Sequence, residues 1–447
     1  MRANKFANFV LISVALFYFI ALVYDLDKIM SFSSLYKLCL LFAGIVICFF
    51  VLRLRQDYKV NLVITGLSIL IGMSLIEIYL FHISGEHKQR MIQAQKMEIP
   101  FDSRSILEVS QELHDQGIDA FPFFHPASIF STNDLEVRGK KIIPLGGVSH
   151  KSTVLCNETG EWIIYQSDEH GFNNPTGLFE VKDIDIILVG DSFTHGTCVR
   201  QGEDIASQLR KMSGLQIINL GMGGNGPLLE LASLKEYAEP LKPKHLLWIY
   251  YEENDLIDLM REQKSSFFLK YLDNKFSLNL INSQPEIDSI LIEYRERTKN
   301  KLTIVNYVKI VKFWYLRQRL GLTASAKPTP SLVTDFVEVL KSAKSLTSSW
   351  NGQLYFVYLP AWHRYAQDVE HGTLFYRNQI LSAVQSLDIP IIDIHDKVFS
   401  THPDPMSLFP FRSYGHYTSE GYRLVAQTIQ ASLKNFEREN TKHVTSQ

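Results

Sequence analysis

Four short segments of the chain carry side chains that are suited to nucleophilic acyl chemistry. Ser192 lies just beyond an apolar run, and His416 lies in a late loop near the carboxyl end. Because a serine hydroxyl is a poor nucleophile, it needs a base that takes its proton and donors that hold the oxyanion formed on the acyl group. His416 is a candidate base, and Gly224 and Asn254 are candidate oxyanion donors.

Gly224 and Asn254 suit an oxyanion for different physical reasons. A glycine lets its backbone N–H approach a reacting carbonyl because no Cβ stands in the way. The neutral carboxamide of Asn254 donates a hydrogen without titrating, which suits a developing negative charge. The Asn254-Asp255 pair is also typical of a helix N-cap, and this structural role is compatible with the catalytic one.

Apolar runs that alternate with helical patterns predict the scaffold that brings these residues together. The pattern predicts a three-layer α/β/α sandwich with a five-stranded parallel sheet, preceded by transmembrane helices, and the default strand order is the flavodoxin-like 2-1-3-4-5. Candidate residues then lie where strands end and distant segments converge. The predicted strands are 184–189, 215–220, 245–251, 354–359 and 390–394, and the predicted helices are 203–212, 228–237, 332–348, 374–386 and 419–436.

Composition divides the chain into four regions. Residues 1–84 are a membrane region, and residues 85–180 are an amino-terminal extension that packs on the core, with short strands near 152–156 and 161–166. Residues 181–438 are the α/β domain, which carries a helical insertion at about 256–330. Residues 439–447 are a flexible tail.

One part of the insertion combines aromatic and basic residues at helical spacing. Residues 305–320 include Trp314 and Tyr315 together with Lys309 and Lys312. Such a pattern can rest on a lipid surface. It is also typical of a lid helix that buries its aromatic side chains against the core, and this is the interpretation that we favour.

Three apolar stretches near the amino end, residues 6–24, 38–52 and 60–81, approach the length that crosses a bilayer as a helix. The second reaches it only when the three residues before it are included. No small-residue cleavage site of a signal peptide follows the first, so we expect three retained spans. Glu77, near the end of the third, is expected to be an interfacial carboxylate rather than a functional intramembrane acid.

Basic residues near the ends of the spans predict their orientation. One side carries Arg2, Lys5, Arg53, Arg55 and Lys59, and the other carries Lys28, Lys37, Lys88, Arg90 and Lys96. The counts are equal, but the last three residues stand well beyond the third span and count for less. We therefore expect the amino terminus in the cytoplasm of a bacterium and the catalytic domain on the periplasmic side of the inner membrane.

The remaining composition bounds the partners and cofactors. The chain has 45 Lys+Arg against 47 Asp+Glu, a balance that gives no support to nucleic-acid binding. The histidines and cysteines lack metal-ligand spacing, and the glycine-rich run 221–226 lacks the ending of a phosphate loop, so no metal and no cofactor is expected. Cys156 and Cys198 are either bridged or two buried thiols.

Four motifs, in order along residues 167 to 436, resemble the blocks of the GDSL/SGNH hydrolases. The motifs are Gly190-Asp191-Ser192-Phe193-Thr194-His195-Gly196, Asn219-Leu220-Gly221-Met222-Gly223-Gly224, Glu253-Asn254-Asp255 and Gly415-His416-Tyr417-Thr418-Ser419-Glu420-Gly421-Tyr422. Each motif alone is weak, but four in order at strand ends are specific. The membrane segments lie outside the resemblance.

The resemblance implies a role for each candidate residue. Ser192 is the expected nucleophile, and its own amide, the Gly224 amide and the Asn254 side chain are the expected oxyanion hole. His416 is the expected general base. His195 is a rival base, although a part in the turn or in a wall of the site is the role we favour for it.

The chain departs from the family pattern at two positions. Ser413 stands where the family usually has an aspartate, three residues before the histidine, and Glu252 replaces a glycine two residues before Asn254. The third member of a triad is therefore open. Asp404 is our choice, and Asp393 or a backbone carbonyl are the alternatives that would orient His416.

The expected function is that of a membrane-anchored serine esterase that forms an acyl-Ser192 intermediate in the cell envelope. Water as acceptor gives hydrolysis, and a glycan hydroxyl gives O-acyl transfer. The expected partners are an ester-bearing substrate, such as an envelope glycan or lipid, and the membrane lipid around the amino-terminal helices. The alternative is a non-catalytic binding or scaffolding protein of the envelope that keeps the fold.

Overall fold

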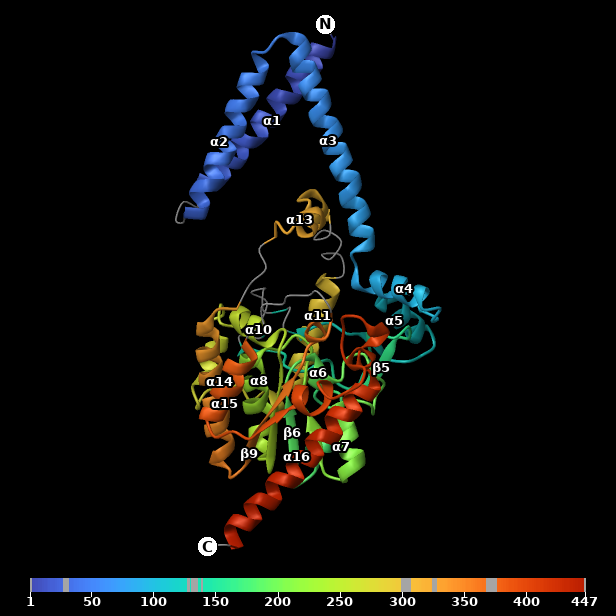
Figure 1. Cartoon of the computed structure of the whole chain (residues 1–447), viewed down its shortest axis with the longest axis vertical. Coiled ribbons are helices and arrows are strands. Elements are labelled where there is room, and N and C mark those ends of the chain that lie inside the picture. The colour runs from blue at the N-terminus through green and yellow to red at the C-terminus, as the bar shows by residue number, and fades with distance from the viewer. Residues whose placement is uncertain are drawn as a thin grey trace. The chain divides into compact units, whose positions relative to one another are not determined.

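The computed structural model describes residues 2–26, 32–126, 129, 136–137, 140–298, 307–323, 328–366 and 376–445. The chain divides into two compact units (Figure 1). The first comprises Met1–Ser84 and Thr303–Thr323, and the second comprises Gly85–Leu302 and Ala324–Gln447. Part of the predicted insertion thus belongs with the amino-terminal helices rather than with the α/β unit.

The second unit is built around a five-stranded parallel sheet. Its order is β10-β9-β8-β6-β7. With β6 counted as the first strand and the sheet followed from β7 to β10, this is the predicted order 2-1-3-4-5. The predicted fold class is therefore confirmed. The strands are β6 (Ile186–Val189), β7 (Ile217–Asn219), β8 (His245–Tyr251), β9 (Gln353–Leu359) and β10 (Ile391–Asp393).

Alternate side chains of each strand enter two separate cores, which is why the strands are apolar throughout. In β6, Ile187 and Val189 point into one core, whereas Ile186 and Leu188 point into the other. Helices α8, α14 and α15 cover the first face, and α7 and α16 cover the second (Figure 1). The bounds are α7 Ile205–Ser213, α8 Pro227–Ser233, α14 Pro330–Ser349, α15 Arg377–Ser386 and α16 Ser419–Thr445.

Short helices and turns complete the carboxyl edge of the sheet and its connections. They include α6 (Ser192–His195), α9 (Glu239–Leu241), α10 (Asp255–Glu262) and α11 (Gln284–Thr298). The predicted helix 374–386 begins outside the described residues, and α15 is described from Arg377 to Ser386. Helix α16 continues through residues 439–445, where we predicted a flexible tail, because no glycine or proline interrupts it before Thr445.

The amino-terminal extension has more regular structure than its scattered turn residues indicate. It contains α4 (Glu86–Lys96), α5 (Ile106–Asp115), β1 (Ala120–Pro122) and the short hairpin strands β2 (Glu136–Val137) and β3 (Lys140–Lys141), followed by β4 (Ser152–Cys156) and β5 (Ile163–Gln166). β4 pairs with β1 in parallel and with β5 in antiparallel orientation. Both strands that we predicted in this region are present.

The first unit consists of apolar helices: α1 (Arg2–Leu26), α2 (Phe32–Leu52) and α3 (Gln56–Ile83), with the short α13 (Trp314–Arg319). Among the described residues, Arg2–Ala21 and Gln56–Ile83 are long and apolar enough to cross a membrane, and Leu41–Leu52 is a shorter apolar stretch. Only 11% of each long window is buried, whereas the core helix of a soluble protein would be mostly buried. The first also has the position of a signal sequence.

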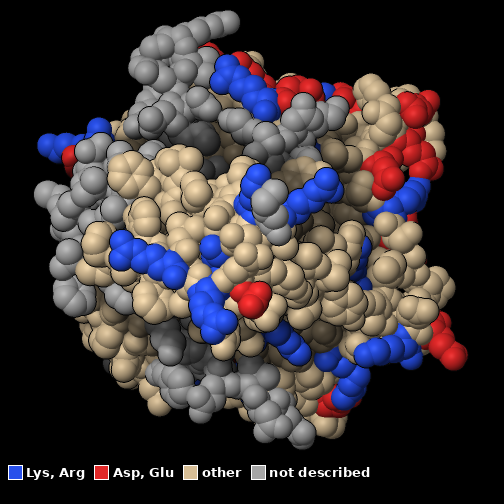
Figure 2. All heavy atoms as spheres, turned by 90° about the horizontal axis from the view of Figure 1, so that it is seen from above, with Lys and Arg blue, Asp and Glu red and all other residues tan. Residues whose placement is uncertain are grey.

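Uncharged side chains predominate on the face of the molecule that Figure 2 shows. Lysine and arginine side chains are scattered near the centre of this face, and acidic side chains gather mainly toward one edge (Figure 2). This face thus carries charges of both signs, in keeping with the nearly equal numbers of acidic and basic residues.

Candidate active site

Ser192 lies at the carboxyl end of β6, where the strand turns into α6. Asp191 caps this helix, since its Oδ1 accepts the Phe193 N–H at 2.8 Å. Ser192 is therefore the first residue of α6, and its partly exposed side chain stands at the edge of the sheet. This is the position that the motif predicts for it.

His416 contacts Ser192 from the loop before α16. The His416 Nε2 atom lies 2.8 Å from the Ser192 Oγ, within hydrogen-bond distance. The Phe193 ring lies beside the imidazole, with ring centroids 4.8 Å apart, and is itself stacked on Tyr251. The structure thus brings together the two residues that we expect to act as nucleophile and general base.

Glu158 completes the chain of polar contacts on the far side of the imidazole. Its Oε1 lies 3.1 Å from the His416 Nδ1, and its Oε2 accepts the His416 backbone N–H at 2.9 Å. An ionised carboxylate only accepts hydrogen bonds, so Nδ1 carries the proton and Nε2 is left as the acceptor that faces Ser192. That tautomer is the one a general base requires.

Arg90 holds Glu158 from the opposite side. The Arg90 Nη2 atom donates to the Glu158 Oε1 at 2.7 Å, and only 9% of either side chain is exposed. Burial by itself raises the pKa of Glu158, but the charges of His416 and Arg90 and the hydrogen bonds from His416 outweigh it, so that the pKa is lowered. Glu158 is therefore ionised at neutral pH.

The turn after β4 fixes the position of Glu158. The Asn157 side chain accepts the Gly160 N–H at 2.9 Å and donates to the Asp102 carbonyl at 3.0 Å, which ties the turn to the chain after α4. Gly415 makes room for the carboxylate, because a Cβ there would lie 2.8 Å from the Glu158 Oε2 and 2.9 Å from the Arg90 guanidinium.

Neither of the aspartates considered for the third position contacts His416. Asp404 is exposed and forms a bidentate ion pair with Arg412, at 2.6 and 2.8 Å, and this pairing lowers its pKa. Asp393, at the end of β10, pairs with Arg377. Our choice of Asp404 is therefore wrong in geometry: a nearby arginine holds its carboxylate, and Glu158 occupies the place beside the imidazole.

Asn254 lies between the end of β8 and the start of α10, beside the catalytic serine. Its Nδ2 donates to the Asp191 Oδ2 at 3.1 Å, which holds the amide group beside the serine, and the Asn254 side chain also hydrogen-bonds Asp258. Asp191 is fully buried, and burial raises its pKa, although the hydrogen bonds from Phe193 and Asn254 oppose this effect.

Gly224 is placed less directly than the other expected donors. It has a positive φ of 83°, which a glycine adopts without strain. The His125 side chain packs against it, since a Cβ on Gly224 would lie 3.2 Å from the His125 Cβ. Gly224 is absent from the lining of the cavity beside Ser192, so its part in the oxyanion hole remains a prediction.

A cavity of about 380 Å³ opens beside the reacting atoms. Ser192, Asn254, His416, Glu158 and Arg90 all border it. The rest of its wall combines aromatic, apolar and charged side chains: Phe193, Tyr251, Glu253, Ile257, Arg261 and Tyr414, with Gly415. An acyl ester that entered this cavity would meet the Ser192 hydroxyl and the Asn254 amide together.

Glu252, the second departure from the family pattern, has a structural role. Its buried carboxylate accepts the Ala361 N–H at 2.7 Å, the Arg364 Nε–H at 2.9 Å and the Tyr358 hydroxyl. These contacts join the carboxyl ends of β8 and β9. A glycine at this position would remove the carboxylate that Arg364 contacts. The glutamate at position 252 and the arginine at position 364 therefore depend on each other.

A disulfide joins the extension to the core, and it answers the question that the sequence left open. Cys156, at the end of β4, is bonded to Cys198, six residues after Ser192, with their Cα atoms 5.5 Å apart. Glu158 follows Cys156 by two residues. The bridge therefore fixes the turn that carries Glu158 close to the nucleophile.

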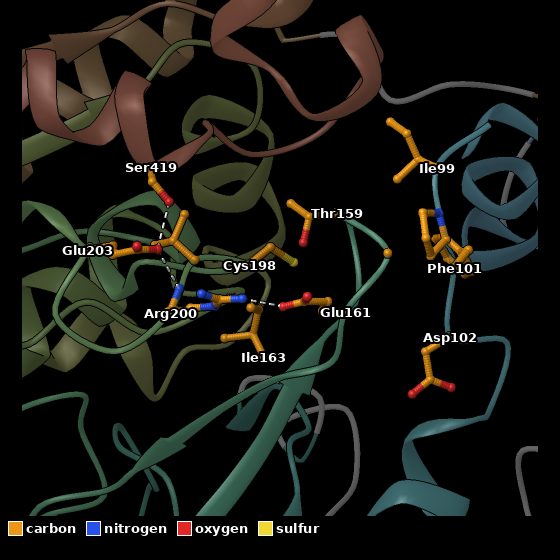
Figure 3. A pocket seen from close by; sticks show the side chains of 13 residues that line it. Ile99, Phe101, Asp102, Thr159, Glu161, Ile163, Cys198, Arg200, Glu203 and Ser419 are labelled. Carbon is orange, nitrogen blue, oxygen red and sulfur yellow. Dashed lines mark hydrogen bonds and ion pairs between the residues drawn. The ribbon is translucent and has the colours of Figure 1, made fainter. Parts of the chain in front are cut away.

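A larger cavity, of about 680 Å³, lies against the same disulfide (Figure 3). Its charged side chains pair with one another: Arg200 with Glu161 at 2.5 Å, and Glu203 with the Ser419 hydroxyl at 2.6 Å. Asp102 pairs with Arg104. The charges of this cavity are thus engaged in holding loops together, and they give no separate indication of a ligand.

Potential metal ligands come together at one place among the described residues, which is the candidate active site itself. Glu158, Cys198 and His416 offer ligand atoms within 4.8 Å of one another. The Cys198 sulfur is in the disulfide and supplies no thiolate. Hydrogen bonding within the site accounts for the other two groups.

Sequence reasoning missed Glu158 and Arg90 because they lie outside every motif. Arg90 was counted only as a basic residue beyond the third span, yet it is buried against Glu158. The available signal was the cysteine pair: a bridge from Cys156 to Cys198 would have placed the acidic residue two positions after Cys156 near the serine.

The comparisons with known proteins come from solved structures. No family model and no curated protein matches the chain. A lipase/acylhydrolase from Enterococcus faecalis is similar at 13% identity and a TM-score of 0.34, with 56% of this chain and 96% of that one covered. A member of the lipolytic protein G-D-S-L family from Veillonella parvula has 13% identity, a TM-score of 0.33 and coverages of 56% and 97%.

An acetyl xylan esterase, AlAXEase, has 12% identity and a TM-score of 0.33, with coverages of 56% and 99%. The three structures are thus described as a lipase/acylhydrolase, a member of the lipolytic G-D-S-L family and an acetyl xylan esterase. At identities of 12–13%, the likeness concerns the fold alone.

Proposed function

We propose that the chain is a membrane-anchored serine esterase in which Ser192, His416 and Glu158 act as a triad. The contact that carries the proposal is the Ser192 Oγ at 2.8 Å from the His416 Nε2, with Glu158 on the other ring nitrogen. The nucleophile is thus within hydrogen-bond distance of the base, and the base is within hydrogen-bond distance of the group that orients it.

The triad performs acyl transfer in two steps. His416 takes the Ser192 proton as the Oγ attacks the ester carbonyl, and it returns this proton to the leaving alcohol when the carbon–oxygen bond breaks. Water, or a glycan hydroxyl, then gives its proton to His416 and attacks the acyl-Ser192 ester. His416 returns this proton to the Ser192 Oγ as the acyl–oxygen bond breaks, which regenerates the free serine and the neutral imidazole. Glu158 stays ionised and stabilises the imidazolium in both steps.

The oxyanion formed in each step is held by hydrogen-bond donors at the edge of the sheet. The Asn254 side chain, fixed by Asp191, and the Ser192 amide at the start of α6 are two of them. The Gly224 amide is the third donor in our proposal, and it requires the exposed His125 side chain to leave room for the substrate.

The location that we propose is a bacterial envelope, with three amino-terminal spans and the catalytic unit outside the cytoplasm. The low burial of the apolar windows in α1 and α3 supports anchoring. The disulfide between Cys156 and Cys198 supports an oxidising compartment. Envelope glycan or lipid esters are the corresponding substrate class. Water as the acceptor of the acyl group gives hydrolysis, and a glycan hydroxyl as the acceptor gives O-acyl transfer.

Ester cleavage by the purified full chain in detergent tests this proposal. We expect turnover of a short activated ester, and we expect Ser192→Ala to lower kcat by about 10⁴-fold or more, because loss of a nucleophile removes the covalent route. Ser413→Ala is the matched control, since this serine lies three residues before His416 but does not line the cavity beside Ser192, and it should keep the wild-type rate.

A serine-directed phosphonate probe should label the wild type and Ser413→Ala but not Ser192→Ala. If wild type and Ser192→Ala are equally inactive on esters and in a transferase assay, and the probe labels neither, a non-catalytic binding protein would be the better description. Reporter fusions after residue 100 test the orientation: activity of a reporter that works only in the cytoplasm would reverse our assignment.

A further inference from the structure

The basic apolar segment, residues 307–322, carries large hydrophobic side chains at a place where the sequence alone leaves their partner open. It belongs to the same compact unit as the amino-terminal helices, and its large side chains are exposed. The exposed set is Tyr307, Val308, Val311, Trp314, Leu320 and Leu322, with Val311 76% exposed. The structure thus groups the segment with the amino-terminal helices, and not with the core on which we expected a lid helix to pack.

The segment is held instead by α3. Glu77 of α3 is fully buried, and its two carboxylate oxygens accept the backbone N–H groups of Tyr315 and Leu316, at 2.9 and 2.7 Å. The Tyr315 ring contacts the Phe81 ring, with centroids 5.6 Å apart. Glu77 thus satisfies free N–H groups in the first turn of α13, where a helix favours a negative charge.

This contact fixes the depth of the segment along α3. Glu77 is six residues before Ile83, the last residue of α3, and at 1.5 Å per residue the distance along the helix is about 9 Å. Amphipathic segments that lie in a membrane interface are buried about 5–10 Å into the boundary between headgroups and acyl chains. The depth of the Glu77 contact matches this range.

The charges of the segment suit the same location. It contains four basic residues, Lys309, Lys312, Arg317 and Arg319, and no acidic residue. Basic side chains beside exposed aromatic and aliphatic ones are typical of surfaces that meet anionic lipid. Soluble proteins rarely leave such a concentration of large apolar side chains uncovered.

We propose that residues 307–322 are an interfacial membrane anchor that is docked on α3 through Glu77 and lies among anionic lipid headgroups at the end of that span. The proposal rests on the membrane anchoring in the proposed function. It gives Glu77 a specific task, since the carboxylate near the end of the span secures a second membrane contact contributed from a region more than 200 residues later in the chain.

Depth-dependent quenching of tryptophan fluorescence tests the proposal in the full chain, reconstituted in vesicles of phosphatidylcholine and phosphatidylglycerol with brominated acyl chains. The chain has five tryptophans, and Trp314 alone belongs to the first unit. The emission difference between wild type and Trp314→Phe therefore reports on Trp314. We expect chain bromines to remove most of this difference, and aqueous iodide to leave it nearly unchanged.

Two further variants make the outcomes distinguishable. Trp350→Phe, in which the lost indole donates to the Pro243 carbonyl of the α/β unit, is the control that should show no bromine quenching. Leu75→Trp in the Trp314→Phe background places a reporter on the exposed side of α3 and should be strongly quenched by bromine if α3 spans the bilayer.

Each pattern of quenching has one meaning. Quenching of Trp314 by bromine supports the anchor, and a stronger effect with phosphatidylglycerol than without it supports the anionic partner. If bromine quenches the reporter on α3 in the Leu75→Trp variant but Trp314 responds to iodide or to neither quencher, the segment lies in water or under protein and the proposal fails alone. If bromine reaches neither Trp314 nor that reporter, the membrane anchoring of the proposed function fails as well.

Discussion

The residues of the candidate active site come from two regions that differ in how they are built. Ser192 and Asn254 stand at the ends of β6 and β8, so the hydrogen bonds of the parallel sheet position them. Glu158 and Arg90 belong to the extension, which lies outside that sheet. The extension reaches His416 through one turn and is fastened by one disulfide.

This difference teaches that the nucleophile and the orienting acid can be set independently within the same fold. The carboxyl ends of the parallel strands position the serine and an oxyanion donor at one edge of the sheet. The acid needs only to reach the Nδ1 side of His416, so an added segment can supply it when Ser413 stands in the place of the usual aspartate. The core then depends on its extension for the orientation of its base.

The largest effect should come from removing the acid that the extension supplies. We expect Glu158→Gln to lower kcat/KM by about 10³- to 10⁴-fold, because the neutral amide removes the charge that stabilises the imidazolium. It also has one acceptor oxygen where the carboxylate has two: with that oxygen toward the His416 Nδ1 and Arg90, its NH2 group faces the His416 backbone N–H, which needs an acceptor. Asp404→Asn is the matched control and should stay within a few-fold of wild type, because Asp404 is exposed and paired with Arg412.

Kinetics on one activated ester decide between the two carboxylates. A large loss for Asp404→Asn with little change for Glu158→Gln would restore the assignment made from the sequence. Little change for both variants would show that the backbone alone orients His416.

The second effect concerns the bridge between the two regions. Replacing Cys156 and Cys198 by alanine opens a loop with a sequence separation of 42 residues, so we expect the α/β unit to lose about 4 kcal/mol of its free energy of unfolding. Denaturant unfolding monitored by near-ultraviolet circular dichroism measures this loss. The residual kcat should exceed that of Glu158→Gln, since the carboxylate remains; a greater loss than that of Glu158→Gln would give the bridge a role beyond positioning.

The third effect concerns the positioning residue Arg90, which acts through Glu158. Arg90→Gln removes a buried charge that lowers the pKa of Glu158. We expect kcat/KM to fall about 10- to 100-fold. The acid limb of the pH–rate profile should move to higher pH, because a lowered pKa keeps Glu158 ionised and its loss lets protonation begin sooner as the pH falls. Arg90→Lys should restore part of both properties, whereas an unmoved acid limb would indicate a merely structural role.

Short motifs made half of the site predictable, and tertiary packing supplied the rest. Ser192, Asn254 and His416 could be predicted because each lies in a motif beside an element whose apolar pattern marks its position. The sheet order followed from the same pattern. Glu158 and Arg90 could not, because the contact between them joins residues 68 positions apart through the folding of the extension, which has no periodic signal. Asp404 was predicted because it is close to His416 in the sequence. In the structure its carboxylate pairs with Arg412 and does not contact the imidazole.

The smallest effect at neutral pH concerns His195, where the core meets the extension. Its fully buried ring lies between Phe123 and Tyr165, with centroid distances of 5.4 and 5.2 Å, and burial lowers its pKa to about 3. The unfolded state, with a histidine pKa of about 6.5, binds the proton more readily, so this residue makes the fold lose stability as the pH falls below about 6.5 toward 3.

We expect His195→Leu to unfold within about 1 kcal/mol of wild type at pH 7.5, because both ring nitrogens lack a hydrogen-bond partner and little is lost with them. At pH 5 the variant should be more stable than wild type by about 2 kcal/mol, from 1.36 kcal/mol for each unit below 6.5. Denaturant unfolding at both pH values measures this, with the exposed His114→Gln as the control that keeps the wild-type pH dependence. An equal stability difference at the two pH values would mean that His195 does not titrate on unfolding, and that the contact between core and extension is insensitive to acid.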